Sequence, residues 1–146
     1  MKTKIMSKTL LTLCVVSVLG SAITQMHGET QASSENEKMP VITIFSTGDV
    51  SRGKTGSFVL NRDPSRLLGG TYVKYSVSGT AIPGVDYVPV VSPAYIGQSG
   101  YGVILVQTLP DPRGFPQRSY SVVVTLEPGL GYAVGQPSSA QIMIEP

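Results

Sequence analysis

The feature that most constrains the fold is a series of turn-forming clusters that recurs throughout the chain from residue 40 onward. Glycine (16) and proline (11) are abundant, and they supply clusters that read RDPS, LGG, SGT, GQSG, PDPRG, PGLG and GQPSS. Such clusters favour tight turns because glycine adopts positive φ angles and proline fixes φ. No segment of about ten residues between them keeps an uninterrupted helical spacing of apolar side chains, so the sequence predicts short strands.

Between the turns, β-branched and aromatic residues alternate with polar ones, which is the period of strands with one buried face. In the segment TYVKYSV, for example, Val73, Tyr75 and Val77 lie on one face. The exception is a nearly continuous apolar run, YGVILVQTL, which is typical of a strand covered on both faces. The six clearest of the predicted strands are Val41 to Phe45, Ser57 to Arg62, Thr71 to Val77, Tyr101 to Leu109, Ser119 to Leu126 and Ala140 to Ile144.

Strand number and spacing point to one fold class. Hydrophobic residues make up 41% of the chain and charged residues 14%, which is too apolar for a disordered chain of this length. About seven strands in about 105 residues, with turns every 8–12 residues, fit a sandwich of two packed sheets. We therefore expect an all-β, immunoglobulin-like seven-stranded β-sandwich over residues 40–146, without the Cys…Trp…Cys pattern of antibody domains.

The first 22 residues have the order of a secretory signal peptide. Lys2, Lys4 and Lys8 precede an apolar run, LLTLCVVSVL, and small residues follow it up to Ala22. The run is shorter than the roughly 20 apolar residues that a membrane-spanning helix needs. We therefore expect cleavage after Ala22, no stable membrane span afterwards, and a secreted protein in the periplasm or outside the cell. The only cysteine, Cys14, would leave with this peptide.

Residues 23–39, ITQMHGETQASSENEKM, are polar and aperiodic, which predicts a flexible leader. They include His27, the only histidine, and a lone histidine in such a segment is a poor candidate for a base or a metal ligand. Without the three lysines of the signal peptide, the 11 basic and 9 acidic residues become 8 and 9. A net charge of −1 gives no reason to expect a nucleic acid partner.

One nucleotide-binding pattern occurs in the sequence. GDVSRGKT fits the G-x4-G-K-[ST] pattern of phosphate loops through Gly48, Gly53, Lys54 and Thr55. Such a loop holds phosphates with the free amides of a helix that follows directly. The next residues read GSFVL, a strand between turns, so we expect a fortuitous match and no nucleotide site.

A longer segment carries a family resemblance. VKYSVSGTAIPGVDY, from Val73 to Tyr87, resembles the Calx-β domain pattern, in which a tyrosine is followed by G-T-A-x-x-G-x-D-Y. The likeness continues through the GQS turn at 97–99, the LPD segment at 109–111 and the closing strand SSAQIMI. It covers about Pro40 to Pro146. The resemblance implies a seven-stranded sandwich, and in some members, above all those of sodium–calcium exchangers, calcium sites at one end of it.

The resemblance also implies which residues would stand at a calcium site. The retained acids are Asp86, Asp111 and Glu145. Where the family has Glu-Gly in its first turn, this chain has Arg52-Gly53, and Gln117-Arg118 replace glutamates further on. Calcium takes six to eight oxygen ligands, several of them charged, and a guanidinium repels the ion.

We therefore expect a degenerate calcium site that binds the ion weakly or not at all, and no other cofactor. Pairing of Arg52 or Arg118 with Asp86 or Asp111 would replace the ion by a salt bridge. Asp86 also has an ordinary structural role open to it, because an aspartate in a glycine turn often accepts backbone hydrogen bonds.

Several functions remain open at this stage. The leading hypothesis is an exported, non-catalytic interaction module for cell-surface or extracellular binding or adhesion, whose partner is an unidentified protein or surface glycan. Alternatives are a weak calcium-binding module and a strand-exchanging assembly subunit, since sheet edges invite strand addition. Candidate contact surfaces are the loop from Pro110 to Arg118 and the tyrosines at 72, 101 and 132, which could equally be cross-strand partners.

An enzyme is not expected. Serine–histidine chemistry would need His27 from the leader, and paired-carboxylate chemistry would need Asp86 and Asp111 to be buried and close together. The segment from residue 40 to the last residue contains no other histidine and no cysteine. The sequence leaves the oligomeric state open.

Overall fold

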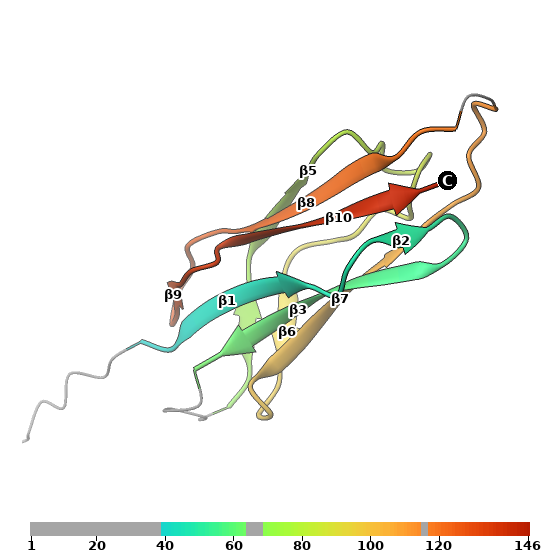
Figure 1. The fold of residues 1–146 in the computed structure, drawn as a ribbon. Helices are drawn as coiled ribbons and strands as arrows, with labels where there is room; N and C mark the ends of the chain where they lie inside the picture. Colours follow the sequence, from blue (N-terminus) through green and yellow to red (C-terminus); the bar gives the residue numbers. More distant parts are fainter. Residues whose placement is uncertain (1–38, 64–68, 115–116) are drawn as a thin grey trace, which may run out of the picture. The chain divides into compact units, whose positions relative to one another are not determined.

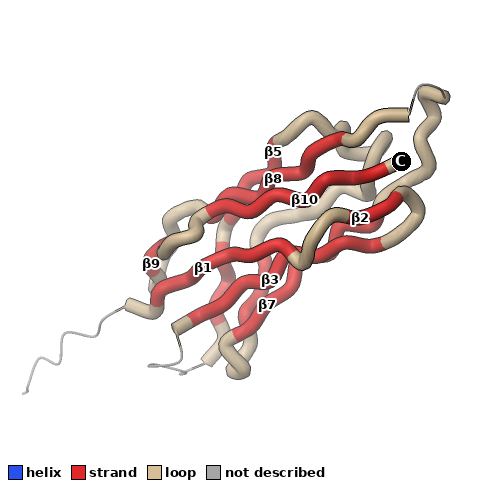
Figure 2. The backbone as a smooth tube through the Cα atoms, viewed as in Figure 1, coloured by secondary structure: helices blue, strands red, loops and turns tan. Residues whose placement is uncertain are grey.

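The structure is a computed structural model that describes residues 39–63, 69–114 and 117–146. These residues form an all-β unit in which two sheets face each other (Figure 1). They contain no helix (Figure 2), so none of the described segments is a helix that could cross a membrane. The expected signal peptide, residues 1–22, and all but the last residue of the expected leader lie outside the described part.

The first sheet has the strand order β7-β3-β1-β9. Its long strands pair antiparallel, and the short β9 runs parallel to β1. The strands are β1 (Val41–Ser46), β3 (Thr55–Arg62), β7 (Tyr101–Gln107) and β9 (Ala133–Val134).

The second sheet has the strand order β2-β10-β8-β5, and a separate pair joins β4 to β6. These strands are β2 (Val50–Ser51), β4 (Thr71–Val73), β5 (Tyr75–Ser78), β6 (Ala94–Ile96), β8 (Tyr120–Leu126) and β10 (Ser139–Glu145). If the consecutive β4 and β5 are taken as one broken strand, the longer elements number seven, and β2 and β9 are additions of two residues each. The expected all-β sandwich is confirmed.

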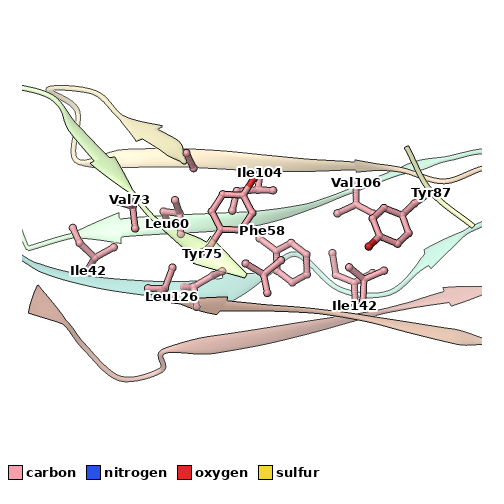
Figure 3. Close-up of a cluster of buried hydrophobic side chains, with 14 of the residues drawn as sticks. Ile42, Phe58, Leu60, Val73, Tyr75, Tyr87, Ile104, Val106, Leu126 and Ile142 are labelled. Carbon is pink, nitrogen blue, oxygen red and sulfur yellow. The ribbon is translucent and has the colours of Figure 1, made fainter. Parts of the chain in front are cut away.

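The core lies between the two sheets and consists of the inward-facing residues that alternate along each strand (Figure 3). Phe58 is the largest apolar side chain that is fully buried. Every second residue of β3 is buried, and β8 and β10 follow the same alternation, with only Tyr120 and Ala140 at their starts half-buried. The fully buried apolar residues of these and the facing strands are Ile42, Ile44, Phe58, Leu60, Val106, Val122, Val124, Ile142 and Ile144.

The predicted strand from Thr71 to Val77 is wrong in one respect, because it breaks at Lys74. β4 pairs with β6, whereas β5 pairs with β8. At the break, the Lys74 amide donates to the Tyr132 hydroxyl at 3.0 Å, and the Lys74 carbonyl accepts from the Glu127 amide at 2.9 Å. The strand therefore changes partners at this residue while the alternation of Val73 and Tyr75 into the core continues.

The prediction that the run from Tyr101 to Leu109 is covered on both faces is also wrong. Strand β7 ends at Gln107, and its residues alternate between exposed and buried. Ile104 and Val106 enter the core, whereas Val103 and Leu105 are 55% and 60% exposed. The run is continuously apolar because its outward face is apolar as well.

Three short strands and one tyrosine were not anticipated. β2, β6 and β9 have two or three residues each, which is too short for a periodic pattern to reveal. Tyr132, expected on the surface, is only 3% exposed, and its hydroxyl donates to the Glu127 carbonyl at 2.7 Å. Tyr72 and Tyr101 are exposed as expected.

The Gly79-Thr80-Ala81 segment of the signature fastens the chain to β8. Gly79 has a φ of 120°. The Thr80 amide donates to the Ser121 hydroxyl and the Ser121 amide to the Thr80 hydroxyl, at 3.0 and 2.8 Å. The Ala81 amide donates to the Ser121 carbonyl at 2.9 Å. The signature glycine is required because a Cβ at position 79 would lie 2.2 Å from that carbonyl oxygen.

We expect the Gly79→Ala variant to lose about 2 kcal/mol of unfolding free energy, because the added methyl group meets backbone and the φ value is strained. Denaturant unfolding measures the loss. Gly84→Ala is the matched control in the same signature, since its φ of 81° imposes strain but its Cβ would meet nothing within 4 Å. Equal losses in the two variants would contradict a specific contact with Ser121.

Candidate functional site

Three loops meet at one end of the sandwich, and they carry most of the residues singled out in the sequence. The turn after β2 holds Arg52, the signature turn holds Asp86, and the loop after β7 holds Asp111. Backbone hydrogen bonds hold these loops together: the Leu109 amide donates to the Asp86 carbonyl at 2.8 Å, and the Thr108 amide to the Lys54 carbonyl at 3.0 Å.

Asp86 lies at the centre of this end and is fully buried. One carboxylate oxygen accepts from the Ile82 amide at 2.8 Å, which closes the signature turn. The other faces two guanidinium groups, those of Arg52 and Arg113. The expected structural role of Asp86 as a backbone acceptor is therefore observed, and the same side chain also anchors an ionic cluster.

Arg52 bridges the two aspartates that the resemblance assigned to a calcium site. Its Nη2 lies 2.7 Å from Asp86 Oδ1 and 3.3 Å from Asp111 Oδ2. Its Nη1 donates to the Leu109 carbonyl at 3.0 Å. The side chain of Arg52 is 8% exposed and that of Asp111 5%. The hypothesis was that Arg52 or Arg118 pairs with Asp86 or Asp111, and in this geometry Arg52 pairs with both aspartates.

Arg113 supplies the second guanidinium. The Asp111 carboxylate accepts from both the amide and the Nε of Arg113, each at 2.9 Å. This local turn folds the Arg113 side chain back toward Asp86, whose Oδ1 it contacts through Nη2. The hydrogen bonds from Arg113 are the main cause that lowers the pKa of Asp111 below its usual range.

Tyr120 covers the two arginines. The Cζ atom of Arg113 lies 3.9 Å from the centroid of the Tyr120 ring, and that of Arg52 lies 5.5 Å from it. The electron-rich face of an aromatic ring attracts a cation at these distances. We define the ionic cluster as Arg52, Asp86, Asp111, Arg113 and Tyr120. Its formal charges are two positive and two negative, so they balance.

Glu145 and Arg118 hold other positions. The Glu145 carboxylate accepts from the Ser119 hydroxyl, and its backbone carbonyl accepts from the Arg52 amide at 3.0 Å. Arg118 is exposed, and the salt bridges seen in the described part of the cluster come from Arg52 and Arg113. The structure thus brings Asp86 and Asp111 together through Arg52 and Arg113, while Glu145 bonds to Ser119.

The residues of the phosphate-loop pattern do not precede a helix. Strand β3 begins at Thr55, directly after the turn that contains Gly53 and Lys54. The Lys54 amide donates to the Thr108 side chain at 3.1 Å. Since a phosphate loop depends on the amides of a following helix, this segment has the geometry of a turn between strands, as expected from the sequence.

The ionic cluster does not fit a calcium ion. Asp86 Oδ1 and both carboxylate oxygens of Asp111 form ion pairs with guanidinium groups, and Asp86 Oδ2 accepts from the Ile82 amide. Among residues 39–63, 69–114 and 117–146, no three His, Cys, Asp or Glu side chains are grouped so as to hold a metal. The two aspartates are near each other, yet Asp111 has a lowered pKa and is ionised at neutral pH, so it is not a proton donor there.

Arg113 is the functional residue that the sequence reasoning missed. It follows Asp111 by two residues in the segment PDPRG. An aspartate that begins such a turn commonly accepts a hydrogen bond from the amide two residues later, and this bond closes the turn. That local signal could have placed Arg113 beside Asp111, whereas the contact with Asp86 depends on the packing of the two loops.

Known structures share this architecture, although no protein-family model and no curated protein sequence matches the chain. The crystal structure of CBD12 from CALX1.2 superposes with a TM-score of 0.59 at 16% identity, over 72% of this chain and 44% of that one. The calcium binding domain CBD12 of CALX1.1 gives 0.53 at 16% identity, over 70% and 43%. The apo form of the Calx CBD1 domain gives 0.50 at 16% identity, over 71% and 96%.

The extent of these matches defines what they establish. This chain spans less than half of the length of the two CBD12 structures, and the identities lie at a level where only the fold is informative. The sequence had indicated this same fold through the signature from Val73 to Tyr87. The chain therefore has a β-sandwich of the Calx-β type.

Proposed function

We propose that this protein is an exported, non-catalytic interaction module of the Calx-β type in which an arginine–aspartate cluster takes the place of calcium. The observation that carries the proposal is the position of the Arg52 guanidinium, 2.7 Å from Asp86 and 3.3 Å from Asp111. A guanidinium in this position supplies positive charge and directed hydrogen bonds. The loops at this end would then be ordered without an ion.

A module of this kind would hold its binding loops in one conformation at any calcium concentration. The loop from Leu109 to Arg113 is tied to the sandwich by the buried Asp86 and by stacking on Tyr120. Loops that are ordered before binding lose less conformational entropy when they meet a partner. We propose an extracellular protein or a surface glycan as that partner.

The exposed tyrosines support a contact function. Tyr72 and Tyr95 are 66% and 53% exposed, and they lie directly opposite each other in the pairing of β4 with β6, with ring centroids 5.0 Å apart. Exposed tyrosines are enriched at protein interfaces. The pair also stabilises the short two-stranded sheet, so its exposure alone does not select the partner.

Absence of a calcium response is the first test of this proposal. We expect the melting temperature of the chain to be the same in millimolar calcium as in chelator, and calorimetric titration to give no binding heat. A ligand that binds the folded state raises the melting temperature. A melting temperature that is clearly higher in calcium than in chelator would instead support the alternative of a weak calcium-binding module.

A double variant tests the role of the arginines by placing a glutamate in the turn at position 52. We expect the double variant Arg52→Glu/Arg113→Gln to melt about 2–5 °C higher in millimolar calcium than in chelator, because its carboxylates are no longer paired with guanidinium groups. Lys54→Glu is the control, since it adds an acid at an exposed position of the same turn but leaves both arginines in place. A calcium response in the control alone would contradict the proposed role of the arginines.

A further inference from the structure

Strand β7 is the longest edge strand in the described part of the sandwich. It stands first in the order β7-β3-β1-β9, whereas the other edge strands of the two four-stranded sheets, β9, β2 and β5, have two, two and four residues. Proteins usually protect edge strands by shortness, charge or proline. The sequence of β7, YGVILVQ, contains neither a charge nor a proline.

Backbone hydrogen bonds at the two ends of β7 show which of its backbone groups point away from the sheet. The Gly100 carbonyl accepts from the Arg62 amide at the start of the strand, and the Thr108 amide donates to the Lys54 carbonyl at its end. In an antiparallel pair, alternate residues bond to the same neighbour. Even-numbered residues of β7 therefore bond to β3, and the amides and carbonyls of Val103 and Leu105 point outward.

Among the described residues, backbone groups from outside the sheet bond only to the last part of this edge. The Val88 amide donates to the Gln107 carbonyl at 2.9 Å, and the Leu109 amide donates to the Asp86 carbonyl at 2.8 Å. Within the described residues, the corresponding groups of Val103 and Leu105 have no such backbone partner. At the other end, the Tyr101 amide makes a long hydrogen bond to the Ser99 hydroxyl at 3.4 Å. The open part of the edge thus runs from the Tyr101 carbonyl to Leu105.

The side chains along the same edge are apolar and exposed. Tyr101, Val103 and Leu105 are 59%, 55% and 60% exposed. Val103 lies opposite Val59 of β3, which in turn lies opposite the exposed Phe45 of β1. The corresponding outward side chains of β8 in the other sheet are Ser121, Val123 and Thr125, and all three are half-buried. The outward side chains beside the open edge are therefore more apolar and more exposed than those of β8.

We propose that β7 pairs antiparallel with the β7 of a second copy of this chain, about a two-fold axis at Val103. In a two-fold antiparallel pair, a strand lies beside an identical strand of the partner. A charged residue near the axis would therefore lie close to a like charge on the partner. β7 carries no charge, which makes it compatible with itself. An axis at Val103 places Tyr101 opposite the partner's Leu105 and leaves the bonded segment Asp86 to Val88 beyond the paired residues.

Sedimentation of the full chain tests the pairing. The result does not depend on the calcium proposal, because no side chain of the ionic cluster lies on this edge. We expect a reversible monomer–dimer equilibrium, and we expect Val103→Lys to raise its dissociation constant by about tenfold or more, since two lysines would then face each other. Phe45→Lys, on the central strand β1, should leave it unchanged. If the chain is a monomer at every concentration, the proposal is overturned. It is also overturned if Phe45→Lys abolishes the dimer while Val103→Lys does not, because that result would indicate packing of the sheet faces.

Cross-linking tests the register directly. In a Cys14→Ser background, we expect Val103→Cys to form a disulfide-linked dimer on oxidation, because directly opposed residues have Cα atoms about 4.5–5.5 Å apart. Leu105→Cys is the control: the two copies of this position would lie about 14 Å apart along the strands, too far for a disulfide. Equal cross-linking of both variants, or of neither, would overturn the assigned axis.

Discussion

The Asp86→Ala variant is expected to lose about 3–4 kcal/mol of unfolding free energy. Asp86 is fully buried and faces the guanidinium groups of Arg52 and Arg113 while accepting from the Ile82 amide. Removing one member of a buried ionic cluster leaves the others without compensation, which costs far more than the whole cluster contributes to stability. Equilibrium denaturation in urea, with the slope checked for two-state behaviour, measures the loss.

Two further variants separate the charge of Asp86 from its local hydrogen bond. Asp86→Asn keeps an oxygen for the Ile82 amide but removes the charge, and it should therefore lose less than Asp86→Ala. The triple variant Asp86→Ala/Arg52→Ala/Arg113→Ala should recover part of the loss, because no buried charge remains unpaired. If Asp86→Ala were as stable as the original chain, the cluster would have no energetic role and the proposed replacement of calcium would lose its basis.

Most of the fold could be predicted because it depends on local patterns. The alternation in SFVLNR and SYSVVVTL assigns a buried face to β3 and β8, and the structure agrees. The short β-branched segment VITIF is strand β1, as expected. The errors lie where tertiary pairing decides. Lys74 divides a strand because β4 and β5 have different partners, and β7 is exposed on one face because only its inner face packs against the core. An apolar run looks the same in a buried strand and in an edge with an unusually apolar surface.

The candidate site could be predicted in part for a similar reason. The exchange of glutamate for Arg52 is visible in the sequence, and an arginine beside retained aspartates suggests a salt bridge. Which second arginine joins the cluster depends on the path of the loop after β7, and the loop brings Arg113 rather than Arg118 to Asp86. Glu145 directly follows the fully buried Ile144, and the alternation of β10 turns its side chain away from the core, where it bonds to Ser119.

Arg62 gave no signal in the sequence, where it was only the end of a predicted strand. It is the largest fully buried side chain, 1% exposed, and it joins three segments at the end of β3. Its Nη1 donates to the Gly69 carbonyl at 3.0 Å and to the Thr71 hydroxyl at 2.9 Å, and its Nη2 to the Gly97 carbonyl at 3.3 Å. A charged residue is rarely buried to this degree, so its cost must be offset by these bonds.

The Arg62→Ala variant is accordingly expected to lose about 3–5 kcal/mol, since it leaves a cavity lined by acceptors that have lost their donor. Arg62→Lys should lose less but remain clearly destabilised, because an ammonium group cannot reach all three acceptors with the fork of a guanidinium. Arg118→Ala, at an exposed position, should change stability by less than about 0.5 kcal/mol. Thermal and urea unfolding of the three variants give the comparison. If Arg62→Ala matched Arg118→Ala, the contacts at the end of β3 would have to form without the guanidinium, and its burial would be incidental to the fold.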